Sequence, residues 1–337
     1  MLQTAALKAA TKSVAAATEP RFFEEAAPAR SVTPRQELIE GLLQSKARIA
    51  PKFFYDVLGS HLFEAITELD EYYPTRTEAS IFADRGPEIA ASVGAFATLI
   101  DLGAGNCVKA GKLFGTLQPV QYVAVDISVA FVRRAVERLA ASHPGIGMAG
   151  VGMDFSASLD LPEELLQELE GAKPLFFYPG SSIGNFTPAQ ALDFLRRIQL
   201  QATGGGLLIG VDLVKAADVL QRAYDDALGV TAAFNRNILR NVNRILGSNF
   251  DPAQWRHVAL FNQVLSRVEM HLEAKQDIVA FWEGGERSFA SGERIHTESA
   301  CKYTVERFDA LLRQAGFRAV RHWSDNEGRY AVFHAVN

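Results

Sequence analysis

The sequence predicts an α/β protein in which a doubly wound, mainly parallel sheet is joined to a second, smaller α+β domain. Between Thr98 and Asp126, an apolar run, a glycine turn, a segment with helical apolar spacing and a second apolar run follow one another, as in a strand–helix–strand unit. This alternation continues to about Lys215 and then stops. Near the end of the chain, over 319–334, two short apolar runs are typical of an antiparallel hairpin.

The glycine turn after the first predicted strand favours a nucleoside cofactor. Gly103 and Gly105 let the backbone approach a ligand closely, and the helix that follows presents free N–H groups to it. Asp126 ends the next strand, where a carboxylate suits the two hydroxyls of a ribose. A dinucleotide-binding turn needs a third small residue where this chain has Val108. The turn therefore favours S-adenosylmethionine (SAM), which has no phosphates, and disfavours an NAD-dependent oxidoreductase.

The composition bounds the class of protein and its partners. Of 337 residues, 48% are hydrophobic and 22% charged, as in a water-soluble globular protein. The net charge of −5 gives no electrostatic reason to expect a nucleic-acid partner. Cys107 and Cys301 lie in no paired pattern, which favours a reducing compartment over a disulfide or zinc scaffold. No apolar run approaches the ~20 residues that span a bilayer. We expect a cytoplasmic, metal-free monomer that contacts neither nucleic acid nor a membrane.

The chain divides into a tail and two predicted domains. Residues 1–35 are alanine-rich and interrupted by prolines, so we expect a mobile tail. The predicted SAM-binding domain takes residues 76–215 and 303–337. The predicted substrate-binding domain takes 36–75 and 216–302, and we expect it to lie over the carboxyl edge of the sheet.

The substrate-binding segments differ in pattern from the sheet domain. Helical periodicity begins near Gln36, a second helix is expected over 60–69, and helices are expected from 216 to about 259. Residues 260–282 alternate as a half-exposed antiparallel pair of strands does. The sheet with its final hairpin is the usual ending of a SAM methyltransferase, so the region 216–302 is interpreted as an insertion.

Two further strand ends carry groups that suit a ligand. Asp154 and Phe155 follow an apolar stretch, where a carboxylate and an aromatic ring can hold an adenine. The alternative is that Asp154 caps the next helix, and the pair alone does not decide between the two. The loop 179–185 follows another strand and is expected at the carboxyl edge of the sheet, where ligands bind in open α/β folds.

Several motifs from about residue 36 to the end of the chain together carry a family resemblance. They are 72–79 (YYPTRTEA), 101–105 (DLGAG), 179–185 (PGSSIGN), 224–227 (YDDA) with 229–232 (GVTA), and 297–298 (TE) with 302–303 (KY). This set resembles the histidine-specific Nα-methyltransferases of ergothioneine biosynthesis. The resemblance implies that the α-amino group of L-histidine is methylated three times with SAM, giving hercynine.

The resemblance also implies roles for individual residues. The positions that match the family's SAM contacts are Gly103, Lys109, Asp126, Asp154 and Phe155, beside Gly105 of the glycine turn. The positions that match the residues holding the carboxylate and amino group of the amino acid are Tyr55, Tyr72, Asn185 and Tyr224. Met270 matches the residue that packs on the imidazole, and Glu298 matches the one that hydrogen-bonds it.

Methyl transfer to an amine needs alignment of nitrogen, methyl and sulfur more than strong acid or base catalysis. Tyr55 and Asn185 are therefore the candidate catalytic residues, because their polar groups suit such positioning. A SAM-binding module without catalysis is disfavoured, because the polar pocket residues are all present.

One position departs from the family pattern. Where the family usually has a serine that gives the imidazole its second hydrogen bond, this chain has Ala300. If 296–301 is extended, Glu298 and Ala300 share a face and Ser299 points away, so Ser299 does not replace the missing hydroxyl. This departure keeps open a second substrate class, namely another aromatic amino acid or a related amine.

Overall fold

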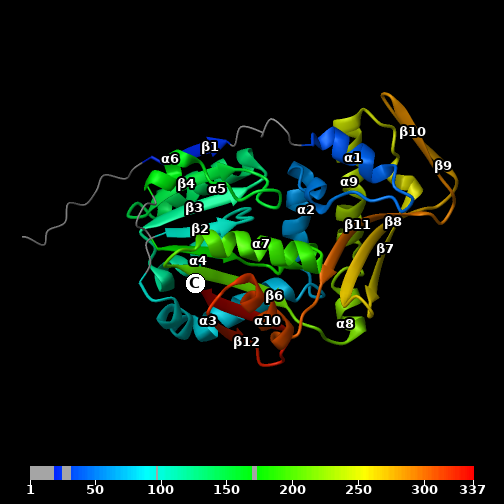
Figure 1. Cartoon of the computed structure of the whole chain (residues 1–337). Helices are drawn as coiled ribbons and strands as arrows, with labels where there is room; N and C mark the ends of the chain where they lie inside the picture. Colours follow the sequence, from blue (N-terminus) through cyan, green and yellow to red (C-terminus); the bar gives the residue numbers. More distant parts are fainter. Residues whose placement is uncertain (1–18, 25–31, 96–97, 169–172) are drawn as a thin grey trace, which may run out of the picture.

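The computed structural model describes residues 19–24, 32–95, 98–168 and 173–337 (Figure 1). The large sheet has eight strands: β1 (Arg21–Glu24), β2 (Thr98–Leu102), β3 (Gln121–Asp126), β4 (Gly147–Gly152), β5 (Pro174–Tyr178), β6 (Gly206–Asp212), β12 (Ala319–Ser324) and β13 (Tyr330–Val336). Across the sheet their order is β1-β4-β3-β2-β5-β6-β13-β12. β1 to β6 run parallel, and β13 is antiparallel to both of its neighbours.

Helices cover both faces of this sheet, which confirms the predicted doubly wound α/β fold. One face packs against α3 (Pro74–Val93), α4 (Val108–Leu117) and α5 (Val129–Ser142). The other packs against α6 (Glu163–Glu168), α7 (Pro188–Gln201) and α10 (Val305–Ala315). β2 and β6 are buried along their whole length, as expected for strands covered on two sides.

The strand order reverses at β2, because β3 lies on one side of it and β5 on the other. In open α/β sheets this switch point opens a crevice at the carboxyl ends of the strands. The glycine turn follows β2, and the loop 179–185 follows β5, so both of these predicted ligand-binding loops meet at this crevice.

One strand lies inside the segment that the sequence analysis predicts to be a mobile tail. Arg21–Glu24 form β1, which pairs in parallel with β4 at the edge of the sheet. Phe22 packs on Gly150, where an added Cβ would lie only 2.8 Å from the Phe22 ring, and the Arg133 guanidinium stacks 4.1 Å above that ring. The rest of the predicted tail up to residue 31 lies outside the described residues, apart from 19–20.

The remaining elements form a smaller lobe with its own core. Its helices are α1 (Pro34–Leu42), α2 (Val57–Thr67), α8 (Ala217–Arg222) and α9 (Val230–Leu246), with the short 3₁₀ turns η1 (Pro51–Phe54) and η3 (Pro252–Gln254). A three-stranded antiparallel sheet has the order β11-β8-β7, from β7 (Trp255–Asn262), β8 (Arg267–Ala274) and β11 (Arg294–Cys301). β9 (Ile278–Trp282) and β10 (Gly285–Phe289) form a separate hairpin. The strand β7 begins at Trp255, before residue 259 where the predicted helical region ends.

Three asparagines on α9 fix the parts of the smaller lobe that face the sheet. Asn241 donates to the Phe53 carbonyl at 2.8 Å, and Asn237 donates to the Asp56 carboxylate at 2.8 Å, so the two residues between these anchors, Phe54 and Tyr55, are held from both sides. Asn235 accepts a hydrogen bond from Thr297 of β11 at 2.7 Å. A buried amide is costly unless it is hydrogen-bonded, which explains why these side chains order the segments around them.

The two lobes also pack directly against each other. The 3₁₀ turn η2 (Ser182–Asn185), which follows β5, packs against β11. Gly184 makes this contact possible, because an added Cβ would lie 2.8 Å from the Cys301 carbonyl oxygen. In the ranges described, no helix is both long and apolar enough to cross a lipid bilayer.

Candidate active site

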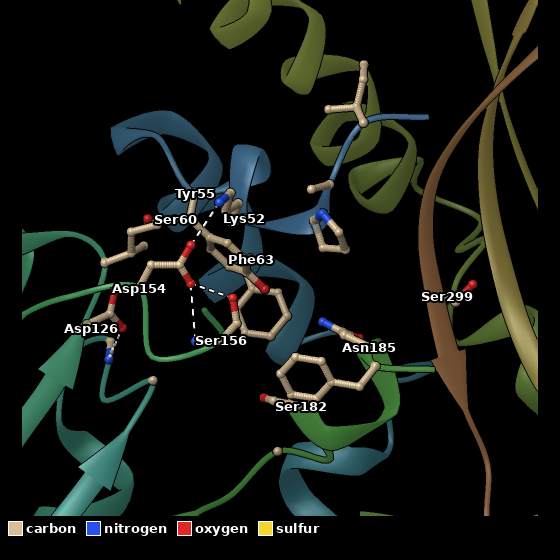
Figure 2. A pocket seen from close by; sticks show the side chains of 18 of the residues that line it. Lys52, Tyr55, Ser60, Phe63, Asp126, Asp154, Ser156, Ser182, Asn185 and Ser299 are labelled. Carbon is tan, nitrogen blue, oxygen red and sulfur yellow. Dashed lines mark hydrogen bonds and ion pairs between the residues drawn. The ribbon is translucent and has the colours of Figure 1, made fainter. Parts of the chain in front are cut away.

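A cavity of about 1360 Å³ lies at the carboxyl ends of β2 to β5, between the sheet and the smaller lobe. Its walls come from the glycine turn, the ends of β3, β4 and β5, and η1 with α2 of the smaller lobe. Of the predicted site residues, those that line it are Gly103, Gly105, Lys109, Asp126, Asp154, Phe155, Tyr55, Tyr72 and Asn185. The structure therefore brings the predicted cofactor residues and three of the predicted substrate residues to one cavity (Figure 2).

The glycine turn forms one wall of the cavity. Gly103 has a φ of +72°, a left-handed conformation that favours glycine. An added Cβ at Gly103 would lie 3.5 Å from the Phe155 ring, so Phe155 extends over the turn. The Gly105 N–H donates to Asp126 Oδ2 and the Ser128 N–H donates to Oδ1, each at 3.0 Å. These bonds fix the Asp126 carboxylate, whose pKa is raised by burial.

Asp154 is held by a lysine from the smaller lobe. Lys52 Nζ lies 2.8 Å from Asp154 Oδ2 and 2.7 Å from Glu37 Oε2, and so links η1 and α1 to the end of β4. Ser156 donates to Asp154 Oδ1 from its backbone N–H and its hydroxyl. Burial opposes ionisation of Asp154, but the bonds from Lys52 and Ser156 outweigh it and lower the pKa of this carboxyl. The alternative that Asp154 caps the next helix is wrong, because α6 begins only at Glu163; the contact of Asp154 with an adenine stays a prediction.

Lys109 projects from α4 toward the loop after β5. Its ammonium lies 2.7 Å from Glu78 Oε2, and Glu78 is 2% exposed. Glu78 Oε1 accepts from the Gly180 N–H at 2.8 Å and from the Tyr330 hydroxyl at 2.7 Å. Lys109 therefore stands at the junction of α3, α4 and the loop that leads to Asn185.

A buried carboxylate beneath the glycine turn has one oxygen without a partner. Asp101 Oδ2 accepts from the Tyr122 hydroxyl at 2.8 Å, whereas Oδ1 contacts no donor in the described chain. Burial raises the pKa of Asp101 to about 7. An acidic turn with two left-handed glycines, a fixed carboxylate and an aromatic ring fits a nucleoside that carries a positive charge, as the sulfonium of SAM does.

Aromatic side chains form the opposite wall. The Tyr55 and Tyr72 rings meet the Phe63 ring edge-on, at centroid distances of 5.9 and 6.2 Å. The Tyr72 and Tyr224 rings lie 6.4 Å apart. Asn185, at the end of η2, faces this wall across the cavity (Figure 2). The sequence analysis does not single out Phe63, although its place on an amphipathic helix between the two tyrosine motifs is a signal for it.

Four predicted residues lie behind this wall rather than on the cavity surface. They are Tyr224, Met270, Glu298 and Ala300. Glu298 pairs with Met270, and Ala300 with Val268, so both side chains of β11 share the face toward the core of the smaller lobe. Ser299 pairs with Glu269, and its hydroxyl lies 2.9 Å from the imidazole of His296 on the other face. The predicted alternation of this strand is therefore present, with a β-bulge between His296 and Glu298 that the sequence does not indicate. The prediction that Ser299 points away from the pocket is wrong, because this other face of β11 and β8 also lines the cavity, with Ser299 among the lining residues.

Glu298 supplies negative charge close to the tyrosines. Burial raises its pKa to about 7, and the Lys302 ammonium acts in the opposite direction. Burial also raises the pKa of Tyr55 and of Tyr72, and the Glu298 charge adds to both shifts. Neutral phenols thus line the cavity near a carboxylate that finds no hydrogen-bond partner among the described residues.

Residues 34–337 match the family described as histidine-specific, SAM-dependent methyltransferases. This chain belongs to that family. It is 40% identical over 309 residues to a histidine N-alpha-methyltransferase of Mycolicibacterium smegmatis, covering 90% of this chain and 94% of that protein. It is 37% identical to the histidine N-alpha-methyltransferase of Mycobacterium tuberculosis, covering 88% and 93%. An ergothioneine biosynthesis protein 1 of Neurospora crassa is 30% identical, over 80% of this chain and 31% of its own length.

Membership of the histidine-specific methyltransferases identifies the chemistry of the cavity. The chain is a SAM-dependent N-methyltransferase, and its substrate is a small molecule, an amino acid. The predicted cofactor and enzyme class are confirmed. The match begins at Pro34, so it excludes the segment before α1 and includes both lobes.

Proposed function

We propose that this enzyme transfers three methyl groups from SAM to the α-amino group of L-histidine, giving hercynine for ergothioneine biosynthesis. The observation that supports this most is the position of Glu298. Its carboxylate has no hydrogen-bond partner among the described residues and lies behind a wall of tyrosines, opposite Met270 on the neighbouring strand; Tyr55 and Tyr72 of this wall line the cavity that holds the glycine turn. The arrangement suits an imidazole at the back and an amine toward the cofactor.

On the cofactor side, Gly103 and Gly105 allow close approach of the turn to SAM, which supplies the methyl group when bound. Asp126 is proposed to accept the two ribose hydroxyls with its remaining lone pairs. Asp154 and Phe155 are proposed to hold the adenine, the carboxylate through the exocyclic amine and the ring by stacking. Lys109 completes the proposed set.

On the amino-acid side, Tyr55, Tyr72, Asn185 and Tyr224 are proposed to hold the carboxylate and the amino group. The amine must be neutral to attack, and its lone pair must point along the line of the departing sulfur. Asn185 and Tyr55 are proposed to impose this direction. The aromatic rings favour a quaternary ammonium by cation–π attraction, which suits the growing cation of successive methylations.

The imidazole is proposed to rest on Met270, with one ring N–H donated to Glu298. A neutral imidazole also has one acceptor nitrogen, and the methyl group of Ala300 offers it no donor. We propose that a water molecule takes this place. The second candidate function, methylation of another aromatic amino acid or a related amine, rests on Ala300 and on nothing else in the site.

We further propose that the enzyme acts as a cytoplasmic monomer, without a nucleic-acid or membrane partner. Cys107 and Cys301 are buried free thiols, which suits a reducing compartment. Light scattering on the purified protein tests the monomer, for which the mass of one chain is expected and a concentration-independent dimer would contradict the proposal.

The experiment that tests the function uses SAM labelled with ¹³C on its methyl group and L-histidine. Nuclear magnetic resonance of the product is expected to show three equivalent labelled methyl groups on the α-nitrogen. Labelled methyl on an imidazole nitrogen would contradict the proposal.

A further inference from the structure

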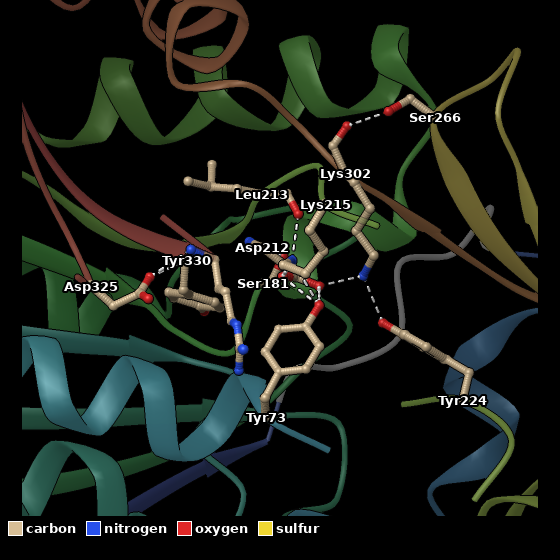
Figure 3. Close-up of polar contacts among 11 residues, drawn as sticks. Tyr73, Ser181, Asp212, Leu213, Lys215, Tyr224, Ser266, Lys302, Asp325 and Tyr330 are labelled. Atoms are coloured by element: carbon tan, nitrogen blue, oxygen red, sulfur yellow. Dashed lines mark hydrogen bonds and ion pairs between the residues drawn. The ribbon is translucent and has the colours of Figure 1, made fainter. Parts of the chain in front are cut away.

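Beneath the tyrosine wall lies a buried cluster of charges that the proposed function does not use (Figure 3). Asp212, at the end of β6, is 1% exposed and is paired with two lysines. Lys302 Nζ lies 2.7 Å from Asp212 Oδ2, and Lys215 Nζ contacts Oδ1. The Tyr73 hydroxyl donates to the Asp212 carboxylate at 2.9 Å and accepts from Lys215 at 2.8 Å.

Among the described residues, only one of the two lysines contacts Tyr224, which lies behind the tyrosine wall. Lys302 donates to the hydroxyl oxygen of Tyr224 at 2.9 Å, and its side chain is 2% exposed. Its backbone is fixed as well, because the Lys302 N–H donates to the Ser266 carbonyl at 2.7 Å and the Ser266 hydroxyl donates back at 3.0 Å. The ammonium therefore has little freedom to leave Tyr224.

This contact decides what the Tyr224 hydroxyl can do. An ammonium has three donors and no acceptor, so the Tyr224 oxygen must accept from Lys302. The phenolic proton then has to be donated elsewhere, and no acceptor for it is present in the part of the chain that the structure describes. Burial raises the pKa of Tyr224, and the Asp212 charge adds to this shift, so the hydroxyl keeps that proton.

Lys302 also stands between two carboxylates. Lys302 and Lys215 outweigh the effect of burial and lower the pKa of Asp212, whereas burial lowers the pKa of Lys215 to about 8. The Lys302 ammonium also acts on Glu298 and opposes the effect of burial on the pKa of that carboxyl. The charge of Lys302 is therefore felt on the tyrosine side of the cluster as well as at Asp212.

We propose that Lys302 is a positioning residue for the α-carboxylate of the substrate: it orients Tyr224 as a hydrogen-bond donor and supplies the positive charge behind it. This inference rests on the proposed function, in which Tyr224 holds the amino-acid carboxylate. It adds the reason why a phenol recognises a charged group. Charge-assisted hydrogen bonds are stronger than neutral ones.

The test is a double-mutant cycle on L-histidine binding, measured by calorimetry with S-adenosylhomocysteine present so that no turnover occurs. Lys302→Met and Tyr224→Phe are each expected to weaken histidine binding about tenfold or more, the size of one hydrogen bond to a charged group. The double variant is expected to bind as Tyr224→Phe alone does, because Lys302 acts through the hydroxyl. S-adenosylhomocysteine affinity is expected to stay unchanged in all four proteins.

Lys215→Met is the matched control. It removes the other partner of Asp212 but no contact of Tyr224, so it is expected to lower stability while changing histidine affinity less than about twofold. Lys302→Arg is expected to restore part of the affinity. If Lys302→Met does not fold, the variant that combines Lys302→Met with Asp212→Asn is used in its place in the cycle, because it removes the charges of Lys302 and Asp212 together.

Two results would overturn the inference. One is unchanged histidine affinity in Lys302→Met. The other is that Lys302→Met weakens histidine binding as much in the Tyr224→Phe variant as in the wild-type protein, which would mean that the lysine acts independently of the hydroxyl. Failure of the wild-type protein to bind histidine would instead refute the proposed function, so the two failures are distinguishable.

Discussion

Glu298 lies directly opposite Met270 on the antiparallel strands β11 and β8, immediately after the bulge at Thr297. Residues so paired have neighbouring side chains on one face of the sheet. A carboxylate and a thioether thus stand together behind Tyr55 and Tyr72, one able to accept an N–H and the other able to pack on a flat ring. We propose this pair as the structural basis for recognition of a heteroaromatic substrate.

The first prediction concerns the position two residues beyond Glu298. Ala300→Ser adds a hydroxyl on the same face, which gives the second imidazole nitrogen a donor. Histidine binding is expected to tighten up to about tenfold, in line with one net hydrogen bond of ~1 kcal/mol. Glu298→Ala serves as the reference and is expected to weaken binding far more. Calorimetric titration decides, and weaker binding of histidine to Ala300→Ser would contradict the account.

Asp126 is expected to govern SAM affinity. Its carboxylate is already fixed by two backbone N–H groups, so it is oriented for a ribose before the cofactor arrives. Hydrogen bonds to a charged group contribute roughly 1.5–3 kcal/mol, so Asp126→Ala should lower SAM affinity at least tenfold. The exposed Asp84→Ala is the control, with no change expected. Equal SAM affinity in the two variants would remove Asp126 from the site.

Asn185 is expected to bind the amino acid and not the cofactor. Its side chain lies across the cavity from the tyrosine wall, in the turn that packs on β11. Asn185→Ala should lose histidine binding while SAM still binds, and the exposed Asn326→Ala should keep both. Product formation by Asn185→Ala at the wild-type rate would show that the loop has another role.

Stability is expected to fall in acid through buried histidines. His334 is 3% exposed, and burial lowers its pKa to about 4. The unfolded chain binds a proton at about pH 6.5 and the folded chain does not, so the free energy of unfolding decreases as the pH falls from about 6.5 to 4. The His334 share of this slope is at most about 1.4 kcal/mol per pH unit. Urea unfolding of His334→Gln should show a smaller slope, whereas an unchanged slope would contradict this assignment.

Much of the fold follows from local patterns, and the exceptions have a common cause. The glycine turn, the acid at the end of β3 and the final hairpin each depend on residues that are close together in the chain. The strand β1 does not follow from a local pattern. It has only four residues, and it is held by pairing with β4, where Phe22 packs on Gly150. Its stability comes from tertiary packing, which periodicity does not report.

The same distinction applies to the site. Asp126 and Asn185 follow strands, so their place at the crevice is predictable from the chain order. The contact between Lys52 and Asp154 joins residues 102 positions apart, and that between Lys302 and Tyr224 joins residues 78 apart. Neither pair is close in sequence. The first contact depends on how the smaller lobe packs against the sheet, and the second on how the end of β11 packs against the segment after α8.

The central claim is that this site selects histidine. The most direct measurement incubates the enzyme with SAM and each amino acid in turn, together with histamine, and identifies the products by mass. The account predicts that L-histidine alone is converted efficiently, to a product carrying three added methyl groups. Conversion of tryptophan, tyrosine or another amine, with none of histidine, would contradict it and would assign to Ala300 a change of substrate.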